Sequence, residues 1–151
     1  MKATFGAGCF WHVEDMLSKT KGVKSTKVGY TGGNLTNPTY EEVCTDKTGH
    51  AEAVEVEYDP KEISYAELLD VFWNNHNPTT LNRQGPDIGN QYRSSIFFHN
   101  ESQKEIAKKS KEKLDSSGKY SNHIVTEIVP SPIFFEAEEY HQKYFQKNGF
   151  S

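Results

Sequence analysis

The stretch Gly6-Ala7-Gly8-Cys9-Phe10-Trp11 lies near the start of the 151-residue chain and decides how the fold begins. An extended run over 3–5 leads into two glycines, and apolar residues then recur from Phe10 at helical steps of three and four. The sequence therefore predicts a strand that turns into a helix at Cys9. Trp11 falls on the side of that helix opposite to the apolar stripe, so we expect its ring to lie outside the core.

A thiol at the start of a helix is a candidate nucleophile. The first turn of a helix leaves backbone N–H groups unpaired and carries a partial positive charge, and both favour an anion. We therefore expect the pKa of Cys9 to lie below the ordinary value of about 8.5. A buried cysteine that packs as a small apolar side chain is the alternative, because burial opposes the helix effect. A dinucleotide-binding fingerprint is excluded, since Trp11 takes the place of its third glycine.

Composition narrows the class of protein. The length predicts a single domain over 1–151. The formal net charge of −4 argues against a nucleic-acid partner, and no segment has the length and apolar character of a membrane span. Two cysteines make no disulfide framework, and no signal-peptide pattern opens the chain. We expect a cytoplasmic monomer that binds neither nucleic acid nor membrane.

Turn and capping signals divide the rest of the chain. Thr39 and Ser64 each open a capping box, with a glutamate three positions later. The expected strands are 23–30, 51–58, 93–98 and 123–129, and the expected later helices are 40–44, one from 65, 101–118 and 135–145. The stretch 74–91 shows no period, which is typical of a functional or mobile loop. This order predicts an α+β fold, with helices packed on a mixed sheet.

One carboxylate in the clearest strand has an unusual position. In the strand expected over 51–58, alternation places Glu52 on the same face as Val54, Val56 and Tyr58. Removal from water raises the pKa of a carboxyl group, which suits a proton donor near neutral pH. The alternative is that Glu52 lies at a frayed strand end and reaches water.

Three function classes are weighed first. A zinc deaminase is suggested by His50-Ala51-Glu52, but no Pro-Cys-x-x-Cys follows, and no His-Glu-x-x-His is present either, so no metal site is expected. A cysteine hydrolase would pair Cys9 with His50, and spacing alone leaves that class open. A binding module would use Trp11 and the loop 74–91 as its contact surface. Neither the hydrolase nor the binding module explains a carboxylate that faces the core.

Thiol redox chemistry is favoured by a set of motifs that covers almost the whole chain. These are Gly8-Cys9-Phe10-Trp11 with Val13-Glu14, Gly29-Tyr30-Thr31-Gly32-Gly33, Asn37-Pro38-Thr39-Tyr40, Glu42-Val43-Cys44, Thr48-Gly49-His50-Ala51-Glu52-Ala53-Val54, Tyr58-Asp59-Pro60, Phe72-Trp73-x-Asn75-His76-x-Pro78, Arg83-Gln84-Gly85-x-Asp87-x-Gly89-x-Gln91-Tyr92-Arg93-Ser94 and Glu139-Tyr140-His141-Gln142. In this order they resemble the signature of the peptide methionine sulfoxide reductases of the A type. The resemblance implies that family's two-layer α+β sandwich with a ferredoxin-like core.

The resemblance also implies a catalytic set. Cys9 matches the nucleophile that attacks the sulfur of methionine sulfoxide, and Glu52 matches the acid that protonates the departing oxygen. Tyr40 and Tyr92 match two tyrosines that hydrogen-bond this oxygen. Asp87 matches an aspartate that positions water and polar partners. The implied substrate is the S epimer of the sulfoxide, free or in oxidised proteins, because one enzyme type serves each epimer.

The implied substrate pocket and the regeneration step complete the expectation. Phe10 and Trp11 match the apolar pocket for the substrate's methyl group. Reduction leaves Cys9 as a sulfenic acid, which a second thiol must reduce. No cysteine follows Cys44, and Cys44 matches a family cysteine for which we expect a packed, structural role. We therefore expect no bound cofactor and an external thiol, either glutathione with glutaredoxin or thioredoxin.

Overall fold

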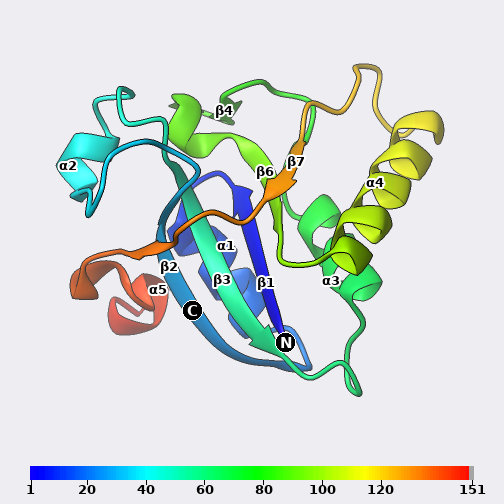
Figure 1. Cartoon of the computed structure of the whole chain (residues 1–151), viewed down its shortest axis with the longest axis horizontal. Coiled ribbons are helices and arrows are strands. Elements are labelled where there is room, and N and C mark those ends of the chain that lie inside the picture. The colour runs from blue at the N-terminus through cyan, green and yellow to red at the C-terminus, as the bar shows by residue number, and fades with distance from the viewer. Residues whose placement is uncertain (150–151) are drawn as a thin grey trace.

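Strand β1 (Lys2–Ala7) runs through the middle of the sheet. The computed structural model describes residues 1–149, and its six-stranded sheet has the order β7-β6-β1-β3-β2-β8 (Figure 1). The other strands are β2 (Val23–Thr31), β3 (Ala51–Tyr58), β6 (Ser94–Phe98), β7 (Glu127–Pro130) and β8 (Phe135–Glu136). Strand β7 pairs in parallel with β6, whereas the other neighbours in this sheet are antiparallel. The sheet is therefore mixed, as predicted.

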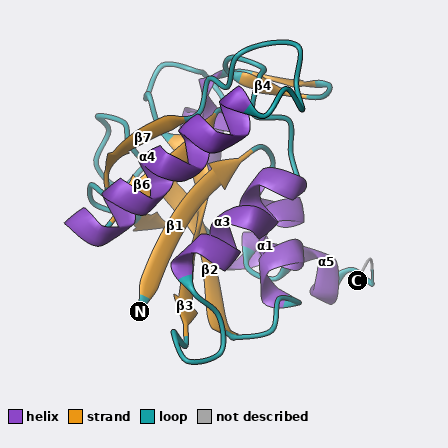
Figure 2. Cartoon of the chain, turned by 90° about the vertical axis from the view of Figure 1, so that its right-hand side faces the viewer, coloured by secondary structure: helices purple, strands orange, loops and turns teal. Residues whose placement is uncertain are grey.

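Three longer helices pack on one face of the sheet. They are α1 (Phe10–Ser18), α3 (Tyr65–Asn74) and α4 (Glu101–Ser116), and Figure 2 shows them on the same side of the strands. Their apolar side chains form one core cluster with those of β1, β3 and β6, in which Phe5, Leu17 and Leu69 are fully buried. A layer of helices on a mixed sheet confirms the predicted α+β class.

The opposite face carries a smaller cluster. Ala51, Ala53 and Phe97 are buried there, beneath the segment that links β7 to β8 and crosses in front of the sheet in Figure 1. Because side chains alternate along β3, Val54 and Val56 face the helices instead. Glu52 shares their face, so its carboxylate points toward the layer of helices.

The helix starts predicted near residues 40, 65 and 101 are confirmed. Thr39 and Ser64 both accept a backbone N–H and complete capping boxes, at the starts of α2 (Tyr40–Val43) and α3. Asn100 caps α4 by accepting from the backbone N–H of Gln103. These contacts lie within a single turn, which is why a short sequence pattern is sufficient to predict them.

The C-terminal part differs from the expectation. The helix predicted over 135–145 is wrong, since β8 is followed by the 3-10 helix η2 (Glu139–His141) and the short helix α5 (Tyr144–Lys147). Phe135 pairs with Tyr30 of β2, and the left-handed conformation of Lys143 separates η2 from α5. The pairing of β8 with the edge strand β2 therefore outweighs the local helical pattern of this segment. The strand predicted over 123–129 is shorter than expected and is displaced, because β7 extends from Glu127 to Pro130.

The aperiodic stretch 74–91 contains two small elements. Strands β4 (Arg83–Gln84) and β5 (Asp87–Ile88) form a hairpin, and the 3-10 helix η1 (Asn90–Tyr92) follows. The hairpin places Asp87 and the residues after it beside the start of α1. None of the helices in the described part of the chain has the length and apolar character needed to cross a membrane.

Candidate active site

The thiol of Cys9 lies at the junction of β1 and α1. Cys9 is the N-cap residue of α1 and is half-buried. The preceding Gly8 has φ of +97°, and a Cβ atom there would lie 2.8 Å from Cγ of Gln84 in β4. A glycine is therefore needed at this position, both for the backbone conformation and for the close approach of the β4–β5 hairpin.

Burial sets the acidity of this thiol. Burial and then the charge of Glu52 raise the pKa of Cys9 to about 11, while hydrogen bonds from the backbone of Trp11 and His12 lower it. The expected depression of the pKa is therefore wrong. The helix start does supply N–H donors to the sulfur, but two hydrogen bonds do not outweigh desolvation and a facing carboxylate.

Glu52 is the second buried titratable group at this junction. Its side chain is 1% exposed, so the prediction from strand alternation is confirmed and the frayed-end alternative is wrong. Its Oε1 accepts the backbone N–H of Phe10 over 3.2 Å. Burial raises the pKa of Glu52 to about 7, and the charge of Asp87 acts in the same direction. A carboxyl group with this pKa is protonated in a large fraction of molecules at neutral pH.

Gln91 is a site residue that the sequence analysis did not identify. Its side chain is 3% exposed, and its Nε2 donates to Oε2 of Glu52 over 2.8 Å. The same nitrogen lies 3.5 Å from Sγ of Cys44. The only available signal was its place in the aperiodic loop beside Tyr92. A glutamine is neutral and is not a nucleophile or an acid, so no sequence pattern marked it as a candidate site residue.

The three other predicted polar residues surround this carboxylate. Tyr40 opens α2, Tyr92 closes η1 and Asp87 belongs to β5. Burial raises the pKa of both tyrosines, and the charge of Glu52 contributes in each case. Both hydroxyl groups therefore stay protonated and can donate hydrogen bonds. The charge of Asp87 also raises the pKa of Cys9, so these residues lie within electrostatic range of one another.

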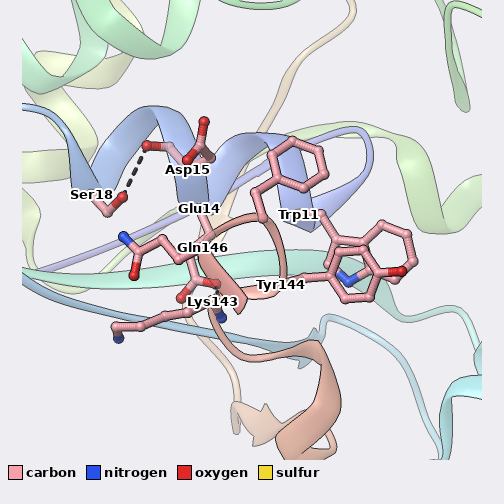
Figure 3. Close-up of a pocket in the computed structure, with 8 residues that line it drawn as sticks. Trp11, Glu14, Asp15, Ser18, Lys143, Tyr144 and Gln146 are labelled. Carbon is pink, nitrogen blue, oxygen red and sulfur yellow. Dashed lines mark hydrogen bonds between the residues drawn. The ribbon is translucent and has the colours of Figure 1, made fainter. Parts of the chain in front are cut away.

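The two predicted pocket aromatics have different environments. Phe10 is 1% exposed and packs inside the core, with ring centroids 5.7 Å from Tyr30 and 5.1 Å from His141. Trp11 is half-buried, and its Nε1 donates to Nδ1 of His141 over 3.0 Å. Its indole stacks on Tyr144, with centroids 3.7 Å apart and planes 7° from parallel. Figure 3 shows these two rings face to face.

The segment around η2 holds several site residues in place, and the sequence analysis assigned it no role. Glu138 accepts the Tyr30 hydroxyl over 2.8 Å and the backbone N–H of Tyr40 over 2.9 Å. The fully buried His141 contacts the rings of Phe10, Trp11 and Tyr40. The expectation of a regular helix here hid these contacts, because they depend on the irregular path of the backbone.

Two further expectations are decided by the environments of Cys44 and His50. Cys44 is exposed, so the packed role expected for it is wrong, although its sulfur contacts Gln91 at the rim of the site. Both ring nitrogens of the buried His50 are used by the backbone, since Nδ1 accepts from Gly33 and Nε2 lies 2.7 Å from the carbonyl of Leu35. His50 thus has no free nitrogen with which to serve Cys9 as a base.

The chain is similar over its whole length to proteins of known activity. The sequence model of the family described as peptide methionine sulfoxide reductase matches residues 1–150. The peptide methionine sulfoxide reductase MsrA of Methanothermobacter thermautotrophicus is 61% identical over 97% of this chain and 87% of its own length. The MsrA of Methanosarcina acetivorans is 62% identical over 99% of this chain and 79% of its own length.

Solved structures agree with this similarity. Reduced Mxr1 from Saccharomyces cerevisiae has a TM-score of 0.93 and 40% identity, covering 100% of this chain and 87% of its own. Methionine sulfoxide reductase A of Corynebacterium diphtheriae has a TM-score of 0.88 and 38% identity, covering 99% of this chain and 76% of its own.

Fold and site together define a thiol-dependent oxidoreductase, with a free cysteine at a helix start beside a buried carboxyl group. The chain belongs to the peptide methionine sulfoxide reductase family, and its relatives are of the A type. Its activity is the reduction of the S epimer of methionine sulfoxide to methionine, with a thiol as the electron source. Among residues 1–149, no group of three or more histidine, cysteine or acidic side chains is arranged to hold a metal ion.

Proposed function

We propose that Cys9 and Glu52 carry out the reduction together. The observation that supports this most directly is the pairing of a half-buried thiol with a carboxyl group that has a pKa of about 7, joined through the backbone N–H of Phe10. The thiolate of Cys9 attacks the sulfoxide sulfur, and the proton of Glu52 goes to the sulfoxide oxygen. That oxygen then passes to the Cys9 sulfur, so methionine leaves and Cys9 becomes a sulfenic acid.

The proton that Glu52 donates comes from the thiol. Between pH about 7 and about 11 the pair holds one proton more than its fully ionised form, because Cys9 has a pKa of about 11 and Glu52 of about 7. Moving this proton from sulfur to carboxyl creates the nucleophile and the acid in one step. A neutral carboxyl group no longer opposes the thiolate, which favours the charge that the helix N–H groups already stabilise.

The remaining residues bind the substrate. Tyr40 and Tyr92 donate hydrogen bonds to the sulfoxide oxygen and stabilise the charge that develops there. Asp87 orders polar groups and water beside them. Trp11 covers the methyl group of the substrate, while Phe10 supports this wall from the core and supplies the N–H that orients Glu52.

An external thiol completes the cycle. The first thiol attacks the sulfenic acid, releases water and forms a mixed disulfide, and a second thiol then frees Cys9. A relative offers one reductant, since yeast Mxr1 has been solved in complex with Trx2. Thioredoxin or glutathione with glutaredoxin is the proposed electron source for this chain.

The substrates, the oligomeric state and the cellular location of the protein are also proposed. Free and protein-bound methionine sulfoxide are the substrates of a single domain over 1–151 that acts as a monomer. The cytoplasm is the location that fits a catalytic thiol best, because its reducing conditions keep cysteines free.

A direct assay tests this proposal. Wild-type protein is incubated with each epimer of a methyl sulfoxide and dithiothreitol, and the remaining sulfoxide is resolved by chiral chromatography. We expect loss of the S epimer only, and no loss with Cys9→Ser, whose fold is checked by circular dichroism. Turnover by folded Cys9→Ser would contradict the role of Cys9, and release of acid from an ester would support a hydrolase instead.

A further inference from the structure

One buried carboxylate takes no part in the proposed reaction. Glu14 lies on α1 and is 2% exposed. Its Oε2 accepts the hydroxyl of Thr26 over 2.8 Å, and its Oε1 accepts the backbone N–H of Lys143 over 2.6 Å. A buried carboxylate is costly unless its oxygens are hydrogen-bonded, so the groups that satisfy it are coupled to its position. Glu14 therefore ties the C-terminal segment to the first helix.

The contact with Lys143 controls the path of the chain. Lys143 has φ of +53° and ψ of +41°, a left-handed backbone conformation that residues other than glycine rarely adopt. This conformation turns the backbone from η2 into α5. Its N–H is the group that Glu14 accepts, so the carboxylate holds the residue at which the direction changes.

The next residue along the chain carries the effect to the proposed substrate pocket. Tyr144 begins α5 and stacks on Trp11, with ring centroids 3.7 Å apart. Figure 3 shows Glu14 and Trp11 on the same side of α1, with Lys143 and Tyr144 facing them. The cleft between α1 and this segment has a volume of only about 10 Å³, about the space of a single water.

A second contact holds the nitrogen of the indole ring. His141 is fully buried, and its Nδ1 accepts the indole N–H of Trp11. An indole N–H can only donate, so Nδ1 must be unprotonated to accept it. The ring of Trp11 is thus held at its face by Tyr144 and at its nitrogen by His141, and both residues belong to the segment that Glu14 anchors.

We propose that Glu14 is a positioning residue for Trp11, which acts by anchoring Lys143 and so seating Tyr144 on the indole that covers the substrate's methyl group. This inference rests on the proposed role of Trp11 in the methyl pocket. It assigns to Glu14 an effect on substrate selection, since a well-seated indole discriminates a methyl from a larger alkyl group on the sulfoxide.

The test compares three variants in a Trp73→Phe background. Trp73 is the second of two tryptophans and donates to Ser110, away from this segment, so its removal leaves Trp11 as the single tryptophan, whose fluorescence is excited selectively at long wavelength. Glu14→Met removes both acceptors at similar length, and Glu14→Gln keeps one acceptor for the Lys143 N–H. Asp15→Asn is the matched control on the same helix, because Asp15 instead pairs with Lys19.

The expected results separate positioning from general damage. In Glu14→Met we expect the KM for a methyl sulfoxide to rise by about 10-fold, the low end of what one misplaced methyl-sized contact costs. The kcat should stay within about 2-fold, because the reacting groups are untouched. The preference for methyl over ethyl sulfoxide should fall, and acrylamide should quench Trp11 more strongly. Glu14→Gln should behave nearly as wild type, as should Asp15→Asn.

A variant at Tyr144 keeps the proposal testable if Glu14→Met does not fold. Tyr144→Leu removes the stacking ring and leaves Glu14 in place, and it should show the same rise in KM and in quenching. The double variant Glu14→Met with Tyr144→Leu should show no further rise, because both changes act on one contact. The proposal is overturned by unchanged Trp11 quenching and KM in folded Glu14→Met, or by additive effects in the double variant.

Failure of this inference differs from failure of the proposed function. If wild-type protein reduces no methyl sulfoxide, the proposed function is wrong, whereas the quenching of Trp11 still reports whether Glu14 positions the indole. If wild-type protein is active and the quenching of Glu14→Met equals that of wild type, the role of Glu14 alone is wrong.

Discussion

The side-chain amide of Gln91 donates to Oε2 of Glu52 over 2.8 Å and thereby opposes the effect of burial on this carboxyl group. A hydrogen bond to the ionised form favours that form, so the Gln91 contact lowers the pKa of Glu52 while desolvation raises it. The resulting pKa of about 7 is a balance between burial and the charge of Asp87, which raise it, and the hydrogen bonds from Gln91 and the Phe10 backbone, which lower it. Gln91 is therefore expected to set the pH range in which the pair with Cys9 holds a single proton.

The first prediction concerns the pH dependence of the reductive step. Below pH about 7 both Cys9 and Glu52 are protonated and no nucleophile is available, and toward pH about 11 the pair has lost both protons and no acid remains. The single-turnover rate should rise through the lower value, reach a plateau and fall toward the upper one. Rapid-quench measurements across this range test it, and a rate that decreases steadily from pH 6 would contradict it.

Replacing Gln91 should move the lower limb of that profile. Gln91→Leu removes the donor, so the pKa of Glu52 rises further and the lower limb shifts to higher pH. The rate at pH 6 should fall more than the rate at pH 9. A structural defect would instead lower the rate by the same factor at every pH, so the ratio of the two rates is the measurement that decides.

Removing the charge of Glu52 should make the thiol more acidic. The charge of Glu52 raises the pKa of Cys9, and glutamine at the same position has no charge. In Glu52→Gln we therefore expect the pKa of Cys9 to fall below about 11 and the reductive step to be strongly slowed, because no proton donor remains. Alkylation of Cys9 by iodoacetamide as a function of pH gives the thiol pKa. An unchanged single-turnover rate would contradict the role of Glu52 as the acid.

Several of these relationships could be predicted from the sequence because they depend on neighbours along the chain. Alternation in β3 is sufficient to place Glu52 among buried side chains, and the position of Cys9 between glycines and an apolar stripe marks the start of α1. The direction of the Cys9 pKa shift was not predictable. Helix N–H groups and burial act in opposite directions, and the extent of burial depends on the β4–β5 hairpin, which the sequence showed only as an aperiodic loop.

The C-terminal segment shows a different limit. The pattern over 135–145 fits a helix, but Phe135 pairs with Tyr30, and the side chain of Gln142 hydrogen-bonds both the N–H and the carbonyl of Val28. These partners lie more than one hundred positions away in the chain, so no local pattern reports them. The same is true of Gln91, whose buried amide is fixed by a carboxylate on another element.

The buried Glu52 should also make the protein less stable at neutral pH than at acidic pH. Its pKa is about 7 in the folded protein and 4.5 as the ordinary value, so the unfolded chain releases this proton first as the pH rises. The contribution of Glu52 to the free energy of unfolding is therefore full below pH 4.5 and is lost as the pH rises to about 7, by at most about 3.5 kcal/mol at about 1.4 kcal/mol per pH unit. Urea unfolding of Glu52→Gln should lack this loss. If the free energy of unfolding changed with pH in the same way for the wild type and for Glu52→Gln, Glu52 would not be desolvated in the folded protein.

The last prediction concerns how Cys9 is regenerated. After one turnover without reductant, we expect Cys9 to carry one added oxygen that dimedone traps, with Cys44 still a free thiol. Other groups lie between the two cysteines, since the Cys44 sulfur contacts the Gln91 amide, and Gln91 in turn hydrogen-bonds Glu52. A disulfide needs the two sulfurs about 2 Å apart and the Cβ atoms about 4 Å apart. Cys44→Ser should therefore retain multiple turnovers with glutathione and glutaredoxin at the wild-type rate. Mass spectrometry of the oxidised protein decides between the alternatives, because a Cys9–Cys44 disulfide would show that the chain supplies its own second thiol.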